Sequence, residues 1–307
     1  MRVLIVGIGG FVGQYLKDEF VGQGYEVLGT DIEVDLAKKL DVPVYKADIL
    51  DENEITELIR KTSPNIIVNL AAISSVGQSW RNPKQAVLVN VIGSLNIIEA
   101  ARKLENVPKI LLVGSSEEYQ STDQLIDETM PLESNSPYGI TKVSQEMFAK
   151  IYRERYDMQI YNVRSFNHTG IGQSVDFVLP SFCKQVADIE KSGKAGKIKV
   201  GNLAAKRDFS DVRDVVRAYR LIVESNHYGK VFNVGSGLAY ELNELLKYII
   251  SLSNQDITVE VDPERFRPVD TPIVCCNNKY IQEQLGWQPQ YSIFETLKEM
   301  FEYYVNG

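Results

Sequence analysis

A glycine motif directly after the first apolar run constrains the fold of this chain more than any other feature. The spacing G-x-x-G-x-x-G begins where a predicted strand at residues 3–6 ends, and a helical pattern follows it. In such a strand–turn–helix unit, the first glycine permits a tight turn, the second lets the backbone approach a pyrophosphate, and the third lets the helix pack closely on the sheet. The motif alone also fits a glycine-rich turn without a ligand. The residues of this predicted dinucleotide-binding loop are Gly7, Gly10, Phe11, Val12 and Gly13.

An acidic residue ends the second predicted strand. Asp31 follows the glycines at about 20 residues, where a carboxylate accepts hydrogen bonds from both ribose hydroxyls of a dinucleotide. The same carboxylate repels a 2′-phosphate, and its neighbours Thr30, Ile32 and Glu33 carry no positive charge. We therefore expect NAD(H) to be preferred. NADP(H) stays possible, because Lys38 is near enough in sequence to fold toward the site.

Short apolar runs alternate with helical patterns through the first half of the chain. The predicted strands are at residues 3–6, 27–28, 66–70, 110–113 and 160–163, and the predicted helices are at 51–61, 85–103 and 138–156. Continuous apolar strands indicate a parallel sheet that is covered on both faces. The alternation of strands and helices predicts an α/β fold with a doubly wound parallel sheet of the Rossmann type.

The pattern changes after about residue 165, where glycines and prolines scatter and the elements become short and mixed. We therefore predict a dinucleotide-binding Rossmann domain at 1–165 and a smaller, discontinuous, mainly substrate-binding lobe at 166–307. A segment near 212–250 is expected to return to the main sheet, because a strand pattern at 231–234 and a helix pattern at 241–250 repeat the order of the first half.

Composition argues against several classes of function. The 307 residues carry a net charge of −8, so the chain lacks the basic excess with which nucleic-acid-binding proteins replace counterions. Its three cysteines, Cys183, Cys275 and Cys276, favour a reducing cytoplasm over a disulfide framework, and the adjacent pair fits a buried strand. With only two histidines, no metal site is predicted. No apolar run is long enough to cross a membrane.

A tyrosine and a lysine share one face at the start of the predicted helix at 138–156. Tyr138 and Lys142 are four residues apart, and a nearby ammonium lowers the pKa of a tyrosine so that it exchanges a proton with a carbonyl or alcohol oxygen. Ser115 and Ser116 close the fifth predicted strand, at the sheet edge where ligands bind. Taken singly, the pair fits an exposed helix face and the serines fit a turn. Together with the glycine loop they favour an enzyme.

These motifs occur in the order and spacing of a known family. The chain resembles the extended short-chain dehydrogenases/reductases over almost its whole length. Within them it is most similar to the GDP-4-keto-6-deoxy-mannose reductases, a sister group of the GDP-mannose 4,6-dehydratases. The segments that carry the resemblance are 113–119, 136–142, 164–173, 207–214, 231–237 and 267–270.

The resemblance implies reduction of a nucleotide-linked 4-keto-6-deoxy sugar, with GDP-4-keto-6-deoxy-D-mannose giving GDP-D-rhamnose. Tyr138 would donate the proton, Lys142 would tune Tyr138 and hold the nicotinamide ribose, and Ser115 would bind the same oxygen. Further cofactor contacts are expected at Asp48, Ile49, Leu70, Ala71, Ala72, Asn90 and His168. Substrate contacts are expected at Ser75, Val76, Ser116, Glu117, Asn167, Arg207 and Arg267.

Three positions bear on which relative the chain matches. Ile171 and Gln120 stand in loops where the family often has proline and glycine. Glu117 matches the position at which the dehydratases carry the carboxylate that removes a sugar proton, so it is counted among the candidate catalytic residues. In a reductase the same side chain would hold a sugar hydroxyl.

Other functions stay open at this point. A dehydratase or a 4-epimerase with tightly bound NAD+ would use the same residues but would regenerate its cofactor. A catalytically silent NAD(P)-sensing regulator or an interaction protein would not need an intact Ser115, Tyr138 and Lys142. Relatives are often dimers packed through two helices, and the helices predicted at 85–103 and 138–156 are the candidates for a homodimer interface.

Overall fold

A seven-stranded parallel sheet forms the centre of the computed structural model, which describes residues 1–33, 40–265 and 271–307. The strand order is β10-β6-β5-β4-β1-β2-β3, so the order reverses direction at β1, which is the doubly wound arrangement predicted from the sequence. The strands are β1 (Arg2–Val6), β2 (Glu26–Asp31), β3 (Val44–Lys46), β4 (Ile66–Asn69), β5 (Lys109–Ser115), β6 (Ile160–Ser165) and β10 (Val231–Val234).

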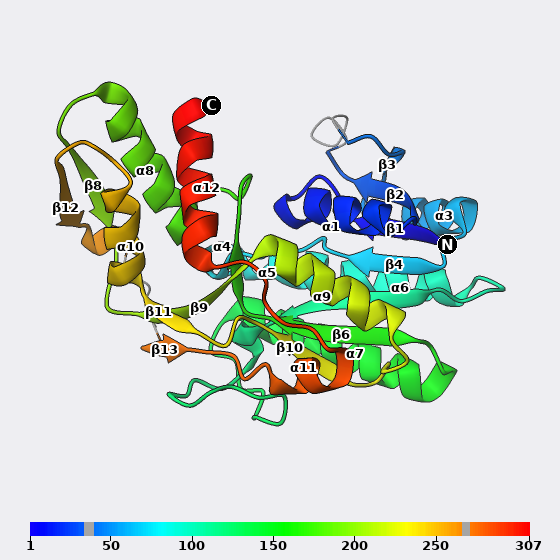
Figure 1. Cartoon of the computed structure of the whole chain (residues 1–307). Helices are drawn as coiled ribbons and strands as arrows, with labels where there is room; N and C mark the ends of the chain where they lie inside the picture. Colours follow the sequence, from blue (N-terminus) through cyan, green and yellow to red (C-terminus); the bar gives the residue numbers. More distant parts are fainter. Residues whose placement is uncertain (34–39, 266–270) are drawn as a thin grey trace.

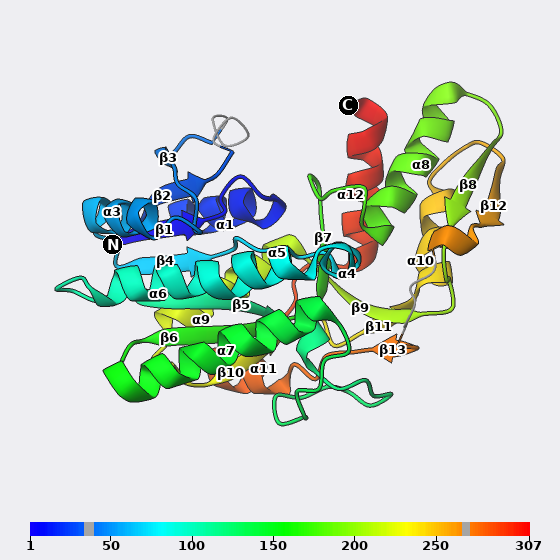
Figure 2. The same ribbon diagram turned by 180° about the vertical axis from the view of Figure 1, so that it is seen from behind.

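Helices cover both faces of this sheet. Figure 1 shows α1 (Phe11–Gly22) and α9 (Val212–Glu224) over one face, and Figure 2 shows α6 (Ser94–Arg102) and α7 (Pro137–Tyr156) over the other, with α3 (Glu52–Thr62) beside β1 and β2. Because both faces are covered, the strands are rich in buried apolar residues, and these side chains form two separate cores.

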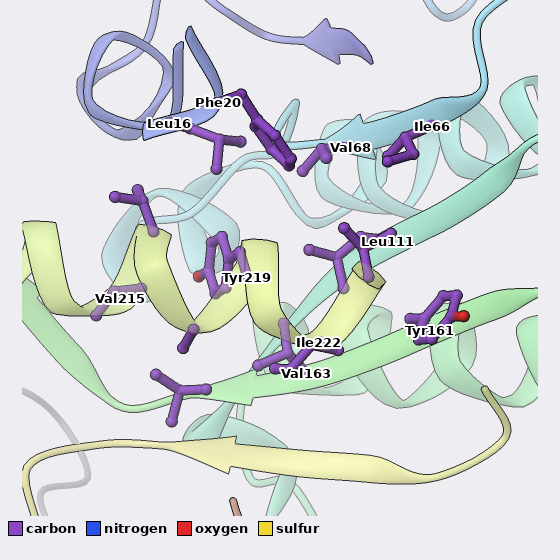
Figure 3. Close-up of a cluster of buried hydrophobic side chains, with 14 of the residues drawn as sticks. Leu16, Phe20, Ile66, Val68, Leu111, Tyr161, Val163, Val215, Tyr219 and Ile222 are labelled. Carbon is purple, nitrogen blue, oxygen red and sulfur yellow. The ribbon is translucent and has the colours of Figure 1, made fainter. Parts of the chain in front are cut away.

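One of these cores lies between the sheet and the helices α1 and α9. Phe20 of α1 and Tyr219 of α9 point toward the same strands, where they meet Val68 and Leu111, as Figure 3 shows. All four side chains are at most 1% exposed. Burying one such side chain stabilises a fold by roughly 1.5–3 kcal/mol. This core therefore holds α1 and α9 firmly on the sheet that carries the candidate site.

The helix predicted at 85–103 is not continuous, which corrects the sequence prediction. It consists of α5 (Pro83–Val87), a π-helical segment (Leu88–Gly93) and α6. The side chain of Asn90 accepts a hydrogen bond from the Ile73 amide at 2.8 Å and donates one to the Ile73 carbonyl at 3.2 Å. A side chain used in this way favours a local widening of the helix, and π-helical turns are frequent at functional sites.

A second lobe is built from α8 (Val178–Ser192), α10 (Leu242–Ser251) and α12 (Ile293–Asn306), which share a core with β8 (Gly196–Val200). Strand β12 (Ile257–Val261) pairs with β8. As predicted, β10 returns to the main sheet, where it pairs with β6. The helix expected at 241–250 does not return with it, because the apolar face of α10 is buried against α8 and α12.

The chain then crosses back once more. Helix α11 (Lys279–Leu285) and the buried Trp287 join the core of the main sheet before α12 ends in the second lobe. A smaller sheet links the two lobes, with β9 (Lys206–Asp211) pairing with β7 (Asn167–Thr169), β11 (Ala239–Glu241) and β13 (Ile273–Val274). Cys275 and Cys276 are buried as expected, but they follow β13 instead of lying within a strand.

Candidate active site

The glycine loop joins β1 to α1 at the carboxyl edge of the sheet. Gly7 has a φ of 79°, a conformation that side chains rarely adopt, and the amides of Gly7 and Ile8 both donate to the Thr30 carbonyl, at 2.8 and 3.2 Å. A Cβ atom at Gly7 would lie 2.8 Å from the Ala71 amide nitrogen. The first glycine therefore permits a tight turn that also brings the end of β4 against the loop.

The other two glycines of the motif have different surroundings. A Cβ atom at Gly13 would lie 2.1 Å from the Ile8 carbonyl oxygen, so only glycine lets α1 pack this closely on the loop. Gly10 is the N-cap of α1 and offers no side chain to cap it. Phe11 and Val12, which open α1, are partly buried. The amides at this helix end are thus available to an anionic group such as a pyrophosphate.

Asp31 lies at the end of β2 beside the glycine loop. One carboxylate oxygen accepts a hydrogen bond from the Gly9 amide at 2.9 Å, and the other accepts one from the Glu33 amide at 3.1 Å. A carboxylate oxygen has a second lone pair, so the group retains acceptor capacity for a ribose. Lys38, the basic residue considered in the sequence, lies outside the described residues.

The remaining strand ends meet at the same edge. Asp48 follows β3 and accepts a hydrogen bond from the Leu50 amide at 2.8 Å, and the buried Ile49 packs against Gly93 of the π-helical segment. Leu70 and the alanines after it continue β4, and all three are partly buried. Five residues predicted to contact the cofactor thus lie around the carboxyl edge of the sheet: Asp48, Ile49, Leu70, Ala71 and Ala72.

Asn90 has a supporting position between the sheet edge and α7. Besides its two hydrogen bonds to the Ile73 backbone, its amide donates to the Thr141 hydroxyl at 2.9 Å. The residue is fully buried. It therefore ties the segment after β4 to the helix that carries the tyrosine and the lysine, and its side chain is occupied within the protein.

Ser115 and Tyr138 come together as the sequence predicted. Ser115 ends β5, Tyr138 is the second residue of α7, and the Ser115 side chain is near enough to act on the pKa of Tyr138. The start of α7 is fixed by Ser136, which accepts from the Gly139 amide at 3.1 Å. The Tyr138 amide donates to the Ser79 hydroxyl at 3.1 Å. Burial raises the pKa of Tyr138, against the lowering effect of the Ser115 side chain, so the phenol is protonated at neutral pH.

Lys142 lies on the same helix face, with Nζ 5.9 Å from the centre of the Tyr138 ring. It donates to the Val113 carbonyl at 2.7 Å and to Gln145 at 3.3 Å. Burial lowers the pKa of Lys142 to about 8. The net lowering of the Tyr138 pKa that the sequence predicts is not seen, because burial raises this pKa. Burial dominates the tyrosine, and the lysine points its charge at a backbone carbonyl.

His168 and Asn167 lie in β7, across from the glycine loop. The His168 ring stacks on Phe11, with ring centres 6.3 Å apart and an angle of 12° between the planes. Its Nδ1 atom is 3.1 Å from the Phe166 carbonyl, and burial lowers the pKa of His168, so the ring is neutral at pH 7. Phe11 and His168 thus form a flat, uncharged wall beside the loop.

A pocket opens next to Ser115. It is lined by four residues that the sequence predicted as substrate contacts, Val76, Ser116, Glu117 and Arg207. Sequence reasoning missed other lining residues, among them Trp80, Asn135 and Thr271. They come from separate segments without a motif, so only the fold brings them together. Of the other predicted contacts, Ser75 caps α4 (Val76–Arg81) by accepting from the Gln78 amide. Arg267 lies outside the described residues.

Sequence reasoning also missed a buried acid at this site. Glu118, at the end of the 3₁₀ turn at Ser116–Glu118, is completely buried and accepts a hydrogen bond from the Ser115 amide at 2.7 Å.

Within the described residues, no three His, Cys, Asp or Glu side chains gather in a way that would hold a metal ion. None of the helices described is both long and apolar enough for a membrane span.

Known proteins are similar to this chain along its whole length. Residues 4–300 match the model of the family described as GDP-mannose 4,6 dehydratase. A GDP-6-deoxy-D-mannose reductase of Pseudomonas aeruginosa is 25% identical over 303 residues, covering 97% of this chain and 95% of the relative. A UDP-glucose 4-epimerase of Mycolicibacterium smegmatis is 30% identical over 319 residues, covering 100% and 99%. The structure of RMD from Pseudomonas aeruginosa complexed with NADPH is 24% identical with a TM-score of 0.88, covers 100% of this chain and 99% of that one, and shows the same fold.

These similarities agree with the site. The family match includes the glycine loop, Ser115, the Tyr138–Lys142 helix and both lobes. The relatives carry different activities at similar identity, so they show the family of this chain but do not identify its substrate. The chain belongs to the GDP-mannose 4,6 dehydratase family of extended short-chain dehydrogenases/reductases, and it is an enzyme of the oxidoreductase type.

Proposed function

We propose that this enzyme reduces a nucleotide-linked 4-keto-6-deoxy sugar with NAD(P)H, and that its substrate is GDP-4-keto-6-deoxy-D-mannose, which it converts to GDP-D-rhamnose. The observation that carries the proposal is the buried pair of Ser115 and Tyr138, which lies beside a pocket lined by the next residue, Ser116. The similarity to a GDP-6-deoxy-D-mannose reductase, which this chain covers over 95% of its length, supports the substrate.

The residues of the glycine loop fit a dinucleotide, because the start of α1 has no side-chain cap and Asp31 keeps acceptor capacity beside it. When bound, the cofactor supplies the hydride for C4 of the sugar. Tyr138 then donates its proton to the oxygen at C4, and the phenolate regains a proton from solvent. Ser115 hydrogen-bonds the same oxygen as negative charge develops on it. Lys142 would hold the nicotinamide ribose and would support the phenolate.

The protonation state of Tyr138 is the one from which the proposed reduction starts. Burial raises the pKa of Tyr138, so at neutral pH the residue is a proton donor. A reductase needs a donor at this position at the start of each turnover. An epimerase or a dehydratase begins by removing the proton of the sugar hydroxyl at C4 and so needs the phenolate.

A dehydratase is the second candidate, and Glu117 favours it. The side chain lines the pocket next to Ser116, where a carboxylate would reach a sugar carbon. The family model that matches this chain is named for the dehydratase activity. In the reductase proposal, Glu117 binds a sugar hydroxyl instead.

Purified protein, NADH and enzymatically generated GDP-4-keto-6-deoxy-D-mannose test the proposal. Loss of absorbance at the NADH band, in a one-to-one ratio with a GDP-6-deoxyhexose identified by NMR, is the expected result. No NADH consumption would reject the reductase. Release of a 4-keto-6-deoxy sugar from GDP-mannose, with cofactor recycled, would then establish the dehydratase, and epimerised product would establish the epimerase.

We expect NADH to be used with a kcat/KM at least about tenfold higher than NADPH, which corresponds to about 1.4 kcal/mol. The carboxylate of Asp31 repels a 2′-phosphate at the loop where the ribose would bind. Asp31→Ser should narrow the ratio, whereas Glu33→Gln, which removes a neighbouring charge, should leave it unchanged. A wild-type preference for NADPH, the cofactor bound to the similar RMD structure, would contradict this assignment.

We also propose a homodimer packed through the helices on one face. Val87 of α5 and Ile92 of the π-helical segment are exposed, as are Phe148 and Ile151 of α7, which runs beside α6 (Figure 2). Light scattering should give twice the mass of the chain. Ile151→Glu should give a monomer, and Ile32→Glu, at an exposed isoleucine elsewhere, should stay dimeric. A monomeric wild-type protein at micromolar concentration would reject the interface.

A further inference from the structure

Two acceptors hold the Lys142 ammonium in a buried part of the candidate site. Its Nζ atom donates to the Val113 carbonyl at 2.7 Å and to Oε1 of Gln145 at 3.3 Å. Gln145 follows Lys142 by three residues on α7, and both side chains are buried. An ammonium has three hydrogens to donate, and the part of the chain that the structure describes takes up two of them. The third is left for a ligand.

The amide of Gln145 is fixed at both of its ends. Its nitrogen donates to the same Val113 carbonyl at 3.3 Å, so Lys142 and Gln145 meet at one peptide group of β5. Its oxygen lies 3.2 Å from the hydroxyl of Ser94 in α6. The single hydrogen of that hydroxyl is shared between Gln145 and the Asn90 carbonyl, which is 2.7 Å away.

The Ser94 hydroxyl also connects this network to the end of β4. It accepts a hydrogen bond from the side-chain amide of Asn69 at 3.1 Å, and the side-chain oxygen of Asn69 accepts one from the Ala71 amide at 3.1 Å. Ala71 in turn lies against Gly7 of the glycine loop. A buried chain of hydrogen bonds therefore runs from Lys142 to the backbone that borders the loop.

A buried glutamine at this place calls for a reason, because a polar side chain gains little net free energy from exchanging water for protein partners. The reason lies in the geometry of the ammonium. With the Val113 carbonyl as its only acceptor, the lysine side chain could still pivot around that one hydrogen bond. A second acceptor at Gln145 removes this freedom and so fixes the direction of the third N–H group.

We propose that Gln145 is a positioning residue of the cofactor site. Together with the Val113 carbonyl, it takes up two hydrogens of the Lys142 ammonium and directs the third toward the nicotinamide ribose. Ser94 and Asn69 hold the Gln145 amide in the orientation that this role requires. The inference rests on the proposed function, because the contact between Lys142 and that ribose is part of it.

Gln145→Met tests this role, because methionine has nearly the same shape and offers no strong acceptor to the ammonium. Isothermal titration calorimetry should show NADH binding weakened by roughly fivefold, the effect of one lost hydrogen bond. ADP should bind this variant as well as it binds the wild type, because ADP carries the adenosine and the pyrophosphate but no nicotinamide ribose. Gln185→Met is a matched control. Gln185 of α8 accepts the Lys199 amide at 2.9 Å in the second lobe, so its loss should leave the NADH affinity unchanged.

A double-mutant cycle shows whether Gln145 acts through Lys142. Lys142→Met alone should weaken NADH binding by roughly tenfold, since the bonds of a charged donor are lost. Adding Gln145→Met to Lys142→Met should then weaken it by less than about twofold more, because no ammonium remains to be directed.

Three results would overturn the proposal and leave Gln145 a structural residue of α7. They are an unchanged NADH affinity in Gln145→Met, an equal loss in both backgrounds of the cycle, and a matching loss of ADP affinity. If Gln145→Met does not fold, Ser94→Ala takes its place, with an expected loss of roughly threefold that must vanish in the Lys142→Met background. These titrations need no sugar, so they are independent of the proposed function, which stands or falls on NADH consumption by the wild-type enzyme.

Discussion

Tyr138→Phe is expected to lower kcat by roughly two to four orders of magnitude while NADH affinity stays near that of the wild-type enzyme. The phenol hydroxyl is the proton donor of the proposed reaction, and it lies near Ser115 at the end of β5. Phenylalanine keeps the ring and its packing but carries no proton to give. Stopped-flow measurement of the NADH signal gives the chemical step, and quenching of protein fluorescence gives the affinity.

A matched control is available in the core. Tyr161 is also fully buried and donates its hydroxyl hydrogen to the Ser225 carbonyl at 2.7 Å, away from the site. Tyr161→Phe should lose about 1 kcal/mol of unfolding free energy and keep its kcat. If Tyr138→Phe turned over at a near-normal rate, or if both variants lost activity alike, Tyr138 would not be the proton donor.

Gly13→Ala is expected to destabilise the fold by roughly 3 kcal/mol, whereas Gly10→Ala should fold normally and bind NADH more weakly. A Cβ atom at Gly13 would lie 2.1 Å from the Ile8 carbonyl oxygen, and α1 would have to leave the sheet to relieve that contact. At Gly10 the nearest atom is the Gly7 carbonyl oxygen at 3.3 Å, which a small shift accommodates.

Urea denaturation measures the stability of both variants, and fluorescence titration measures their NADH affinity. The two glycines look alike in the sequence motif, so the contrast tests the geometry of the loop. Equal losses of stability in the two variants would contradict the packing role of Gly13. Unchanged NADH affinity in a folded Gly10→Ala would contradict the role of the loop in binding the pyrophosphate.

Features that depend on local sequence were predictable. The glycine loop, the strand that ends at Asp31 and the helix start before Tyr138 follow from backbone conformation and apolar pattern, which neighbouring residues determine. The break of the helix at 85–103 was not predictable, because it coincides with a contact between Asn90 and Ile73, a residue in another segment. A periodic pattern does not report such a contact.

The electrostatics of the site were also beyond the sequence. The spacing of Tyr138 and Lys142 gives a shared helix face, but it does not tell that burial outweighs their mutual effect. Glu118 is one of two adjacent acids, and such a pair usually lies in solvent. Only the structure, in which Glu118 packs against Gly114 and lies near Arg164, shows which of the two acids is buried. The lining of the pocket likewise depends on the meeting of distant segments.

The repeated crossing of the chain between the two lobes has a consequence for engineering and for evolution. The second lobe is assembled from α8, α10 and α12, and the segments between them return to the main sheet as α9, β10 and α11. No single cut releases this lobe as an independent piece, and loss of the last helix alone would strip Leu297 and Met300 from its core. To graft the specificity of one relative onto another, three separate stretches must be transplanted together, so new substrates are more readily reached by changing individual pocket residues than by exchanging blocks.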